Sequence, residues 1–264
     1  MTKTCFIIGA SSGIGYATAR KFSEEGYVVA NGSRTPCSLD GVKNYTVDVA
    51  TPKTIYNAIK DIDLKHKRLD VLVYSAGYSM AAPVEHVKEE DYRYLFDVNF
   101  FGAIEAARAV IPVMKKQGGG TIIIVSSIAG VLPIAFDAYY SASKAAVNML
   151  VRELNLELAP HNIRAISVMP GGTQTAFHTK RNVYSELEAG LYSDRMENAV
   201  KKLAKTEQEG LTPEQVAETI FECATAKKAP ELVSVGIKNK AFHMFDRLMP
   251  RLETRLFLRM RYKV

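Results

Sequence analysis

Cysteine is scarce in this sequence, and its spacing excludes several classes of protein. Cys5, Cys37 and Cys223 lie far apart, and no C-x-x-C pattern occurs. A disulfide framework and a zinc site are therefore not expected, and a reduced, cytoplasmic setting fits better. The histidines likewise show no metal-ligand spacing, so we predict no metal site.

Long hydrophobic runs are also missing. No run of about 18 apolar residues occurs, so no membrane-spanning helix is expected. The first apolar run, residues 5–8, is too short for a secretory signal and predicts a buried strand. The 264 residues have an ordinary composition, with 47% hydrophobic and 23% charged residues. This excludes a disordered or collagen-like chain and leaves enough length for one large α/β domain.

The excess of positive charge is confined to the last residues. Residues 238–264 contain eight Lys or Arg and two Asp or Glu, a difference of +6 that equals the net charge of the whole chain. The remaining residues are neutral overall and give no sign of nucleic-acid binding.

The same C-terminal residues have a helical pattern. One face is hydrophobic, with Phe245, Leu248, Met249, Leu252, Leu256 and Met260, and another carries Arg247, Arg251, Arg255 and Arg259. This pattern predicts an amphipathic basic helix in a C-terminal extension, residues 238–264. It fits a helix at a membrane surface, a gate over the substrate, an oligomer contact or simple packing on the parent domain.

Short apolar runs alternate with helical patterns along most of the chain. Strands are predicted over residues 5–8, 27–30, 44–49, 69–74, 121–125, 163–168 and 231–235. Helices are predicted over 14–25, 51–62, 88–117 and 137–158. The alternation predicts a single-domain Rossmann-type fold over residues 1–237, with a doubly wound parallel sheet and helices on both faces.

One segment departs from this alternation. Residues 173–210 are polar, rich in charge and predicted to be free of strands. They follow the carboxyl end of a strand, where ligands bind in such sheets. A substrate lid and a plain exposed helical insertion are both consistent with the pattern.

A glycine-rich turn follows the first strand. It reads Gly9-Ala10-Ser11-Ser12-Gly13-Ile14-Gly15 and opens a helix. Glycines let the backbone approach a pyrophosphate, and the helix N-terminus supplies unpaired N–H groups and partial positive charge. We therefore predict a dinucleotide site here.

The end of the second strand distinguishes NAD from NADP. An acid there would bind a ribose hydroxyl and repel a phosphate, but the chain has Ser33 and Arg34 and no acid. Arg34 can bind a 2′-phosphate through its guanidinium, and Ser33 can add a hydroxyl. The predicted cofactor is NADP(H).

A tyrosine and a lysine lie four residues apart on a predicted helix. Tyr140 and Lys144 therefore share one face, and an ammonium near a phenol favours the phenolate. Tyr140 could then exchange a proton with a substrate oxygen. Ser127 follows the fifth strand and could hydrogen-bond the same oxygen.

Together these residues strongly resemble the short-chain dehydrogenases/reductases. The resemblance rests on Gly9, Gly13, Gly15, Ser127, Tyr140 and Lys144, and it extends to about residue 235. It implies that Tyr140 is the proton donor or acceptor and that Ser127 orients the substrate carbonyl. It also implies that Lys144 lowers the pKa of the tyrosine and binds the nicotinamide ribose. Asn99, in Asp97-Val98-Asn99, would support a proton-relay water.

The resemblance also assigns cofactor contacts. Asp48 and Val49 match the pair that contacts adenine, and the segment beside the nicotinamide is matched by Pro170, Gly171, Thr173 and Thr175. Two positions depart from the family pattern: Ile8 replaces the usual Thr, and Ser75-Ala76-Gly77 replaces Asn-Ala-Gly. Because serine has fewer hydrogen-bonding groups than asparagine, the local scaffold could be tied differently.

The predicted substrate wall is apolar. It comprises Val131, Leu132, Pro133, Ile134, Phe136, Met169 and Phe177. A lipophilic secondary alcohol or ketone suits such a wall, and the segment 173–177 resembles the hydroxysteroid and retinol dehydrogenase branch. A hydroxysteroid, including a bile acid, is the first choice. A retinoid or an acyl-dihydroxyacetone phosphate remains an alternative, as does a non-catalytic NADP(H) sensor or scaffold. The resemblance further implies a homodimer or homotetramer.

Overall fold

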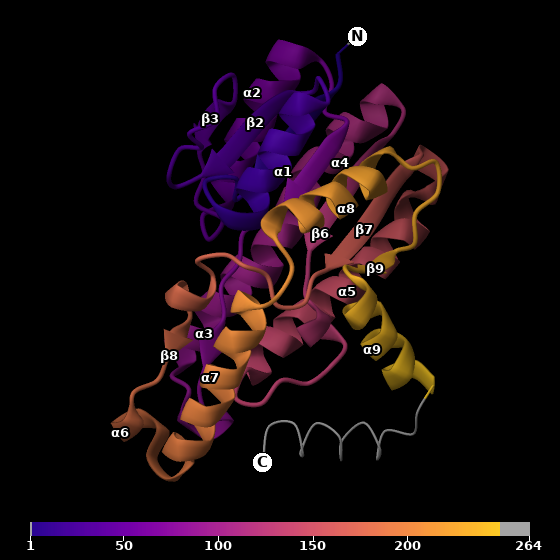
Figure 1. The fold of residues 1–264 in the computed structure, drawn as a ribbon. Coiled ribbons are helices and arrows are strands. Elements are labelled where there is room, and N and C mark those ends of the chain that lie inside the picture. The colour runs from indigo at the N-terminus through magenta and orange to yellow at the C-terminus, as the bar shows by residue number, and fades with distance from the viewer. Residues whose placement is uncertain (1, 249–264) are drawn as a thin grey trace.

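Seven parallel strands form the centre of the molecule. The computed structural model describes residues 2–248. The strand order is β3-β2-β1-β4-β6-β7-β9 (Figure 1). The strands are β1 Thr4–Ile8, β2 Val28–Ser33, β3 Lys43–Thr46, β4 Val71–Tyr74, β6 Gly120–Val125, β7 Ile163–Met169 and β9 Leu232–Ser234. The order reverses direction between β1 and β4, which makes their carboxyl ends the expected ligand crevice.

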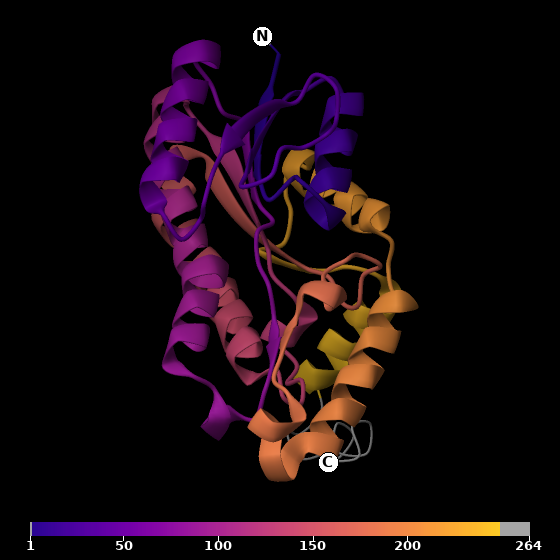
Figure 2. The same cartoon turned by 90° about the vertical axis from the view of Figure 1, so that its left-hand side faces the viewer.

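Helices cover both faces of this sheet (Figure 2). One face carries α1 Gly13–Glu24 and α8 Pro213–Thr225, and the other carries α2 Pro52–His66, α4 Gly102–Gln117 and α5 Ala138–Leu158. Phe22 on α1 meets Phe221 on α8 edge-on, with ring centroids 5.2 Å apart. Each face has its own buried cluster, because strands covered on both sides are apolar throughout. The predicted single-domain, doubly wound fold is confirmed.

The long helix predicted over 88–117 contains an irregular turn. The structure has α3 Glu89–Phe96, a π-helical turn over Asp97–Phe101 and then α4. Such turns are found mostly at functional sites, and this one contains the predicted site residue Asn99. After α4 the chain reverses at Gly118, whose φ of 86° favours glycine.

The prediction that residues 173–210 contain no strand was wrong. This segment includes β8 Asn182–Val183, which pairs in parallel with β5 Met80–Ala81. A strand of two residues has no recognisable alternation, so the sequence could not reveal it. The segment also contains two helices, α6 Glu186–Ala189 and α7 Ser193–Gln208. Short 3-10 turns lie at Val84–His86, Ile128–Gly130, Ala159–His161, His178–Lys180 and Gly190–Tyr192.

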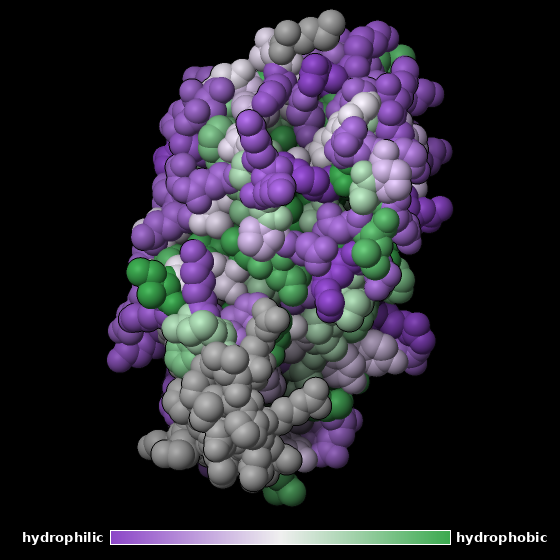
Figure 3. All heavy atoms as spheres, turned by 90° about the vertical axis from the view of Figure 1, so that its right-hand side faces the viewer, coloured by the Kyte–Doolittle hydropathy of each residue, from purple (hydrophilic) through white to green (hydrophobic). Residues whose placement is uncertain are grey.

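The C-terminal extension begins as a helix, α9 Ile237–Leu248. Its early residues Ile237 and Met244 are exposed. Figure 3 shows the side of the molecule that lies to the right in Figure 1. Hydrophilic residues cover most of its upper part, and separate hydrophobic groups lie nearer its middle. The basic stripe predicted beyond residue 248 lies outside the described residues. Among residues 2–248, no helix is long and apolar enough to cross a membrane.

Candidate active site

One cavity of about 600 Å³ opens at the carboxyl edge of the sheet. It begins at the turn after β1 and extends to α7. It brings together most of the predicted site residues: Gly9, Ser11, Ser12, Gly13, Ile14, Ser33, Arg34, Asp48, Val49, Ser75, Ala76, Gly77, Ser127, Tyr140, Lys144, Pro170, Gly171, Thr173, Thr175 and Phe177. Gly15, Asn99, Val131 and Phe136 are not part of its lining.

The turn between β1 and α1 is built from backbone that only glycine adopts readily. Gly9 has a φ of 99° and Gly13 a φ of 56°. A Cβ on Gly9 would lie 2.7 Å from the backbone nitrogen of Ala76, and one on Gly15 would lie 2.1 Å from the Gly9 oxygen. Gly15 therefore sits behind the turn and lets α1 pack against it. The first-turn amides of α1 remain available to a phosphate, so the cradle fits a pyrophosphate.

The cavity rim at the end of β2 carries a cation and no acid. Arg34 is exposed there, and its guanidinium donates to the Tyr94 hydroxyl over 3.5 Å. The Ser33 hydroxyl donates to the side-chain oxygen of Asn31 at 2.7 Å. The same oxygen accepts from the backbone N–H of Ala10 at 3.1 Å, which ties the glycine turn to β2. This rim fits an anionic group on the cofactor.

Asp48 and Val49 follow the end of β3 rather than lying within it. The predicted strand over 44–49 ends at residue 46 in the structure. The Asp48 carboxylate accepts from the backbone N–H of Ala50 at 3.1 Å, which fixes the turn that leads into α2. Both residues line the cavity, at the position where the family resemblance predicts adenine contacts.

The phenol of Tyr140 lies beside Ser127 and Lys144. Tyr140 and Lys144 lie on successive turns of α5, and the Lys144 ammonium is 5.6 Å from the centre of the Tyr140 ring. That ammonium donates to the backbone oxygen of Val125 at 2.9 Å, which anchors it to the end of β6. Ser127 follows β6, and its hydroxyl lies close enough to the phenol to lower the pKa of that group. The three polar groups predicted from the sequence therefore meet at one point.

The electrostatics of this cluster differ from the expectation. Burial, followed by the charge of Asp137, raises the pKa of Tyr140 above its ordinary value, although the hydrogen bond with Ser127 opposes this. Burial lowers the pKa of Lys144 to about 8. In the structure the pKa of Tyr140 is thus raised rather than lowered, and burial is the largest cause. Near neutral pH the phenol is protonated, which is the form that donates a proton to a carbonyl.

Asn99 lies behind the cavity, fully buried in the π-helical turn. Its amide nitrogen donates to the Tyr78 backbone oxygen at 2.9 Å and to the Ser143 hydroxyl at 3.1 Å. Its oxygen accepts from the Tyr78 backbone N–H at 3.1 Å. A Cβ on Gly77 would lie 3.0 Å from this oxygen and 3.5 Å from the Lys144 nitrogen. A side chain at position 77 would therefore crowd Asn99 and Lys144, which glycine avoids.

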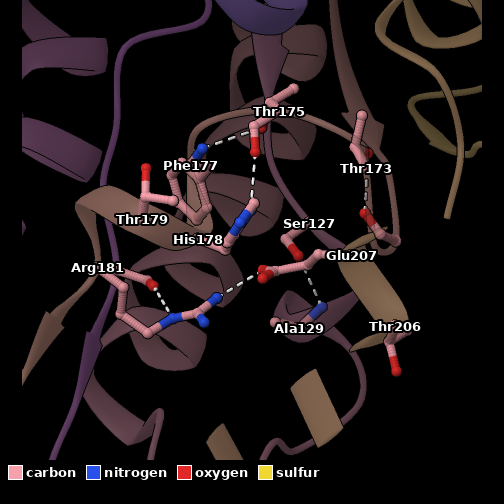
Figure 4. Close-up of polar contacts among 12 residues, drawn as sticks. Ser127, Ala129, Thr173, Thr175, Phe177, His178, Thr179, Arg181, Thr206 and Glu207 are labelled. Atoms are coloured by element: carbon pink, nitrogen blue, oxygen red, sulfur yellow. Dashed lines mark hydrogen bonds and ion pairs between the residues drawn. The ribbon is translucent and has the colours of Figure 1, made fainter. Parts of the chain in front are cut away.

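Two other segments complete the cofactor half. Ser75 begins the loop after β4, and its N–H donates to the Ile8 oxygen at 2.8 Å, so backbone ties this loop to β1. Thr173 and Thr175 lie in the loop after β7. The Thr175 hydroxyl accepts from the Phe177 N–H at 3.2 Å, and the Thr175 backbone oxygen contacts the His178 ring at 2.8 Å (Figure 4).

The predicted substrate wall is partly wrong. Val131 and Phe136 do not line the cavity. Phe136 adopts a φ of 62° and packs in a neighbouring hydrophobic cluster, where its ring meets that of Tyr192. Met169 is fully buried core, and Leu132 and Pro133 also lie off the lining. The apolar side chains that line the cavity include Ile128, Ile134, Phe177 and Leu203, and the Phe177 ring centre lies 6.0 Å from that of Tyr140.

Three buried charged residues that the sequence did not single out also line the cavity: Asp137, Arg181 and Glu207. All three are buried, with 3%, 7% and 8% of their surface exposed. Figure 4 shows Arg181 and Glu207 pointing toward each other, and their ion pair measures 2.5 Å. Asp137 could have been noticed three residues before Tyr140, whereas Arg181 and Glu207 lie far away in sequence.

Comparison with known proteins assigns the family. A family model described as short chain dehydrogenase matches residues 3–185. The chain belongs to the short-chain dehydrogenase family. Members of this family use a nicotinamide cofactor, which agrees with the glycine turn and the cavity described above.

Individual short-chain dehydrogenases resemble this one over most of its length. A 3-ketodihydrosphingosine reductase of Bacteroides thetaiotaomicron is 36% identical over 233 residues, 87% of this chain and 86% of that protein. An NADPH-dependent 1-acyldihydroxyacetone phosphate reductase of Saccharomyces cerevisiae is 33% identical over 190 residues, 68% of this chain and 64% of that protein. The structure of a short-chain dehydrogenase from Streptomyces avermitilis superposes with a TM-score of 0.83 at 26% identity. The superposition covers 100% of this chain and 96% of the Streptomyces avermitilis chain.

Proposed function

We propose that this short-chain dehydrogenase is an NADP(H)-dependent reductase that converts a ketone on a lipophilic molecule to a secondary alcohol. The observation that carries the proposal is the position of the Tyr140 phenol, in one cavity with Ser127, Lys144 and the glycine turn. A carbonyl bound there meets a proton donor and lies within reach of a cofactor held by the turn.

The chain's own residues supply the proton and the orientation. The nicotinamide, when bound, supplies the hydride that reduces the carbonyl carbon. The Ser127 hydroxyl positions the carbonyl oxygen, and Tyr140 donates its proton to that oxygen as negative charge develops there. The C=O double bond becomes a C–O single bond, the hydride forms the new C–H bond and the proton forms the new O–H bond. Lys144 stabilises the phenolate left behind, because its ammonium lies over the same ring.

NADPH rather than NADH is the proposed cofactor. Arg34 stands on the rim at the end of β2, where no acidic side chain competes with a 2′-phosphate. The name of the yeast relative, which specifies NADPH, supports the same choice.

A ketone on a long hydrocarbon chain is the substrate class that the comparisons favour. The substrate half of the cavity has an apolar lining of Ile128, Ile134, Phe177 and Leu203. The names of the two relatives specify lipids, a ketodihydrosphingosine and an acyldihydroxyacetone phosphate. The hydroxysteroid first expected from the sequence is a second candidate, because the same lining suits a flat ring system.

The test is a substrate panel with purified full-length chain. NADPH and NADH oxidation are followed with long-chain ketones, ketosteroids, retinal and a short hydrophilic ketone. We expect turnover with NADPH of at least one long-chain ketone, at a kcat/KM at least about tenfold above the short ketone. Binding of NADPH without turnover of any carbonyl would favour the sensor alternative and contradict the proposal.

A further inference from the structure

The substrate end of the cavity has an unbalanced set of buried charges. Asp137 and Glu207 are carboxyl groups, and Arg181 is the buried cation beside them. Lys144, another buried cation of the cavity, is held on the cofactor side by the Val125 oxygen. Lys180 also lines the cavity, but its side chain is exposed. Two buried acids therefore share one buried guanidinium.

The Arg181 guanidinium makes its hydrogen bonds to other side chains of the protein. Its Nε donates to the Ser79 hydroxyl at 2.7 Å, and its Nη2 donates to Glu207 Oε1 at 2.5 Å. These bonds tie the start and the end of segment 173–210 to the loop before β5. The guanidinium therefore donates to one oxygen of Glu207. It donates neither to the other oxygen of Glu207 nor to the free oxygen of Asp137.

Two carboxyl oxygens have no hydrogen-bond partner among the described residues. They are Oδ1 of Asp137 and Oε2 of Glu207. Asp137 stands at the N-cap of α5, where an aspartate ordinarily accepts from the first turn, yet it makes no such bond. Burial raises the pKa of Asp137 to about 7, although the charge of Arg181 opposes this. Buried acceptors without partners are costly, so a donor from outside the chain is expected.

The position of these oxygens relates them to the reacting carbonyl. Asp137 is the N-cap residue of α5, three residues before Tyr140, and both side chains line the cavity. Asp137, Glu207 and Arg181 all act electrostatically on the phenol of Tyr140. One bound molecule can therefore contact the phenol and the two carboxyl groups together.

We propose that Asp137 and Glu207 form an ammonium-binding subsite, and that the substrate is a long-chain ketone that carries a primary amine near the carbonyl. An ammonium supplies three donors and one positive charge, which matches two free acceptors and one excess acid. A hydroxyl supplies one donor and no charge, so it satisfies only part of the site. This inference rests on the proposed function and specifies its substrate class.

The test compares two ketones that differ only in the amine. One is a long-chain 2-amino-3-ketone, and the other is the same 3-ketone without the amino group. With NADPH, we expect the wild type to prefer the amino ketone at least about tenfold in kcat/KM. Asp137→Asn should reduce this preference by about tenfold or more, chiefly through a higher KM for the amino ketone. Glu207→Gln should reduce it in the same direction.

Glu197→Gln is the matched control. Glu197 lies on α7 like Glu207, but it is exposed, pairs with Lys201 and does not line the cavity. This variant should keep the wild-type preference. Equal loss of activity toward both ketones in Asp137→Asn would assign the residue a structural role and overturn the proposal. A wild type that reduces both ketones equally would overturn it as well.

A binding measurement separates this inference from the proposed function. Thermal melting with NADP+ is repeated with a long-chain 2-amino-1,3-diol and with the same diol lacking the amine. Greater stabilisation by the amine, lost in Asp137→Asn, supports the subsite even if no ketone is reduced. Reduction of ketones without any amine-specific stabilisation or preference supports the proposed function and contradicts the subsite.

Discussion

Arg34 is the residue on which the choice of cofactor depends. It is exposed at the end of β2, and its guanidinium donates a hydrogen bond to the Tyr94 hydroxyl over 3.5 Å. Arg34→Asp places a negative charge where a 2′-phosphate would bind, so kcat/KM for NADPH should fall at least about 100-fold relative to that for NADH. Steady-state kinetics with both cofactors measure this. Arg93→Asp, an exposed change on α3 outside the cavity, is the control. Equal losses for both cofactors in Arg34→Asp would contradict the assignment.

Asp137 should also affect stability in a pH-dependent way. Its pKa is raised from 3.8 to about 7 in the folded chain. Between these values the unfolded chain releases a proton that the folded chain keeps, so this group lowers stability as the pH rises. Asp137→Asn removes that effect and should gain stability relative to the wild type, on the order of 2 kcal/mol, between about pH 5 and pH 8.

Urea unfolding of both proteins at the two pH values measures the change. Asparagine has nearly the same shape, and no helix-cap hydrogen bond is lost because Asp137 makes none. If the free energies of unfolding of variant and wild type differ by a constant amount across this pH range, the Asp137 carboxyl titrates as it does in the unfolded chain, which contradicts the prediction.

At the level of elements, the turn between β1 and α1 is held close to the loop after β4. Gly9→Ala introduces a Cβ 2.7 Å from the Ala76 nitrogen at a φ of 99°. This change should destabilise the fold by about 1–3 kcal/mol and weaken NADPH binding at least about tenfold. Gly41→Ala is a matched control, because Gly41 has a φ of 78° but nothing within 4 Å of the added Cβ. Fluorescence titration that finds the same NADPH affinity in both variants would contradict this role of the turn.

Regular elements could be predicted from the sequence because their signal is periodic and local. The buried runs around residues 5–8 and 121–125 match β1 and β6, and the segment 137–158 matches α5. The exceptions have no such period. The π-helical turn at residues 97–101 looks like ordinary helix in sequence, and β5 and β8 are two residues each. Their existence depends on tertiary contacts, which outweigh local propensity.

For the whole molecule, the sheet brings distant segments to one edge. Residues from Gly9 to Glu207 meet in one cavity, and the phenol, serine and lysine predicted from motif spacing are close together there. The Arg181–Glu207 pair could not be predicted in this way, since nothing in the sequence links the two ends of segment 173–210. The wall residues Val131 and Phe136 were misplaced, because apolar character alone does not tell a cavity wall from core.

The central claim is that hydride and proton reach one carbonyl beside Tyr140. The most direct measurement is a reaction of the full chain with a long-chain ketone and NADPH doubly deuterated at C4, followed by mass spectrometry of the product. We predict one deuterium on the new carbinol carbon for the wild type. Tyr140→Phe should still bind NADPH but form the product at least about 1,000-fold more slowly. Unlabelled alcohol, or labelled alcohol formed equally fast by Tyr140→Phe, would contradict the account.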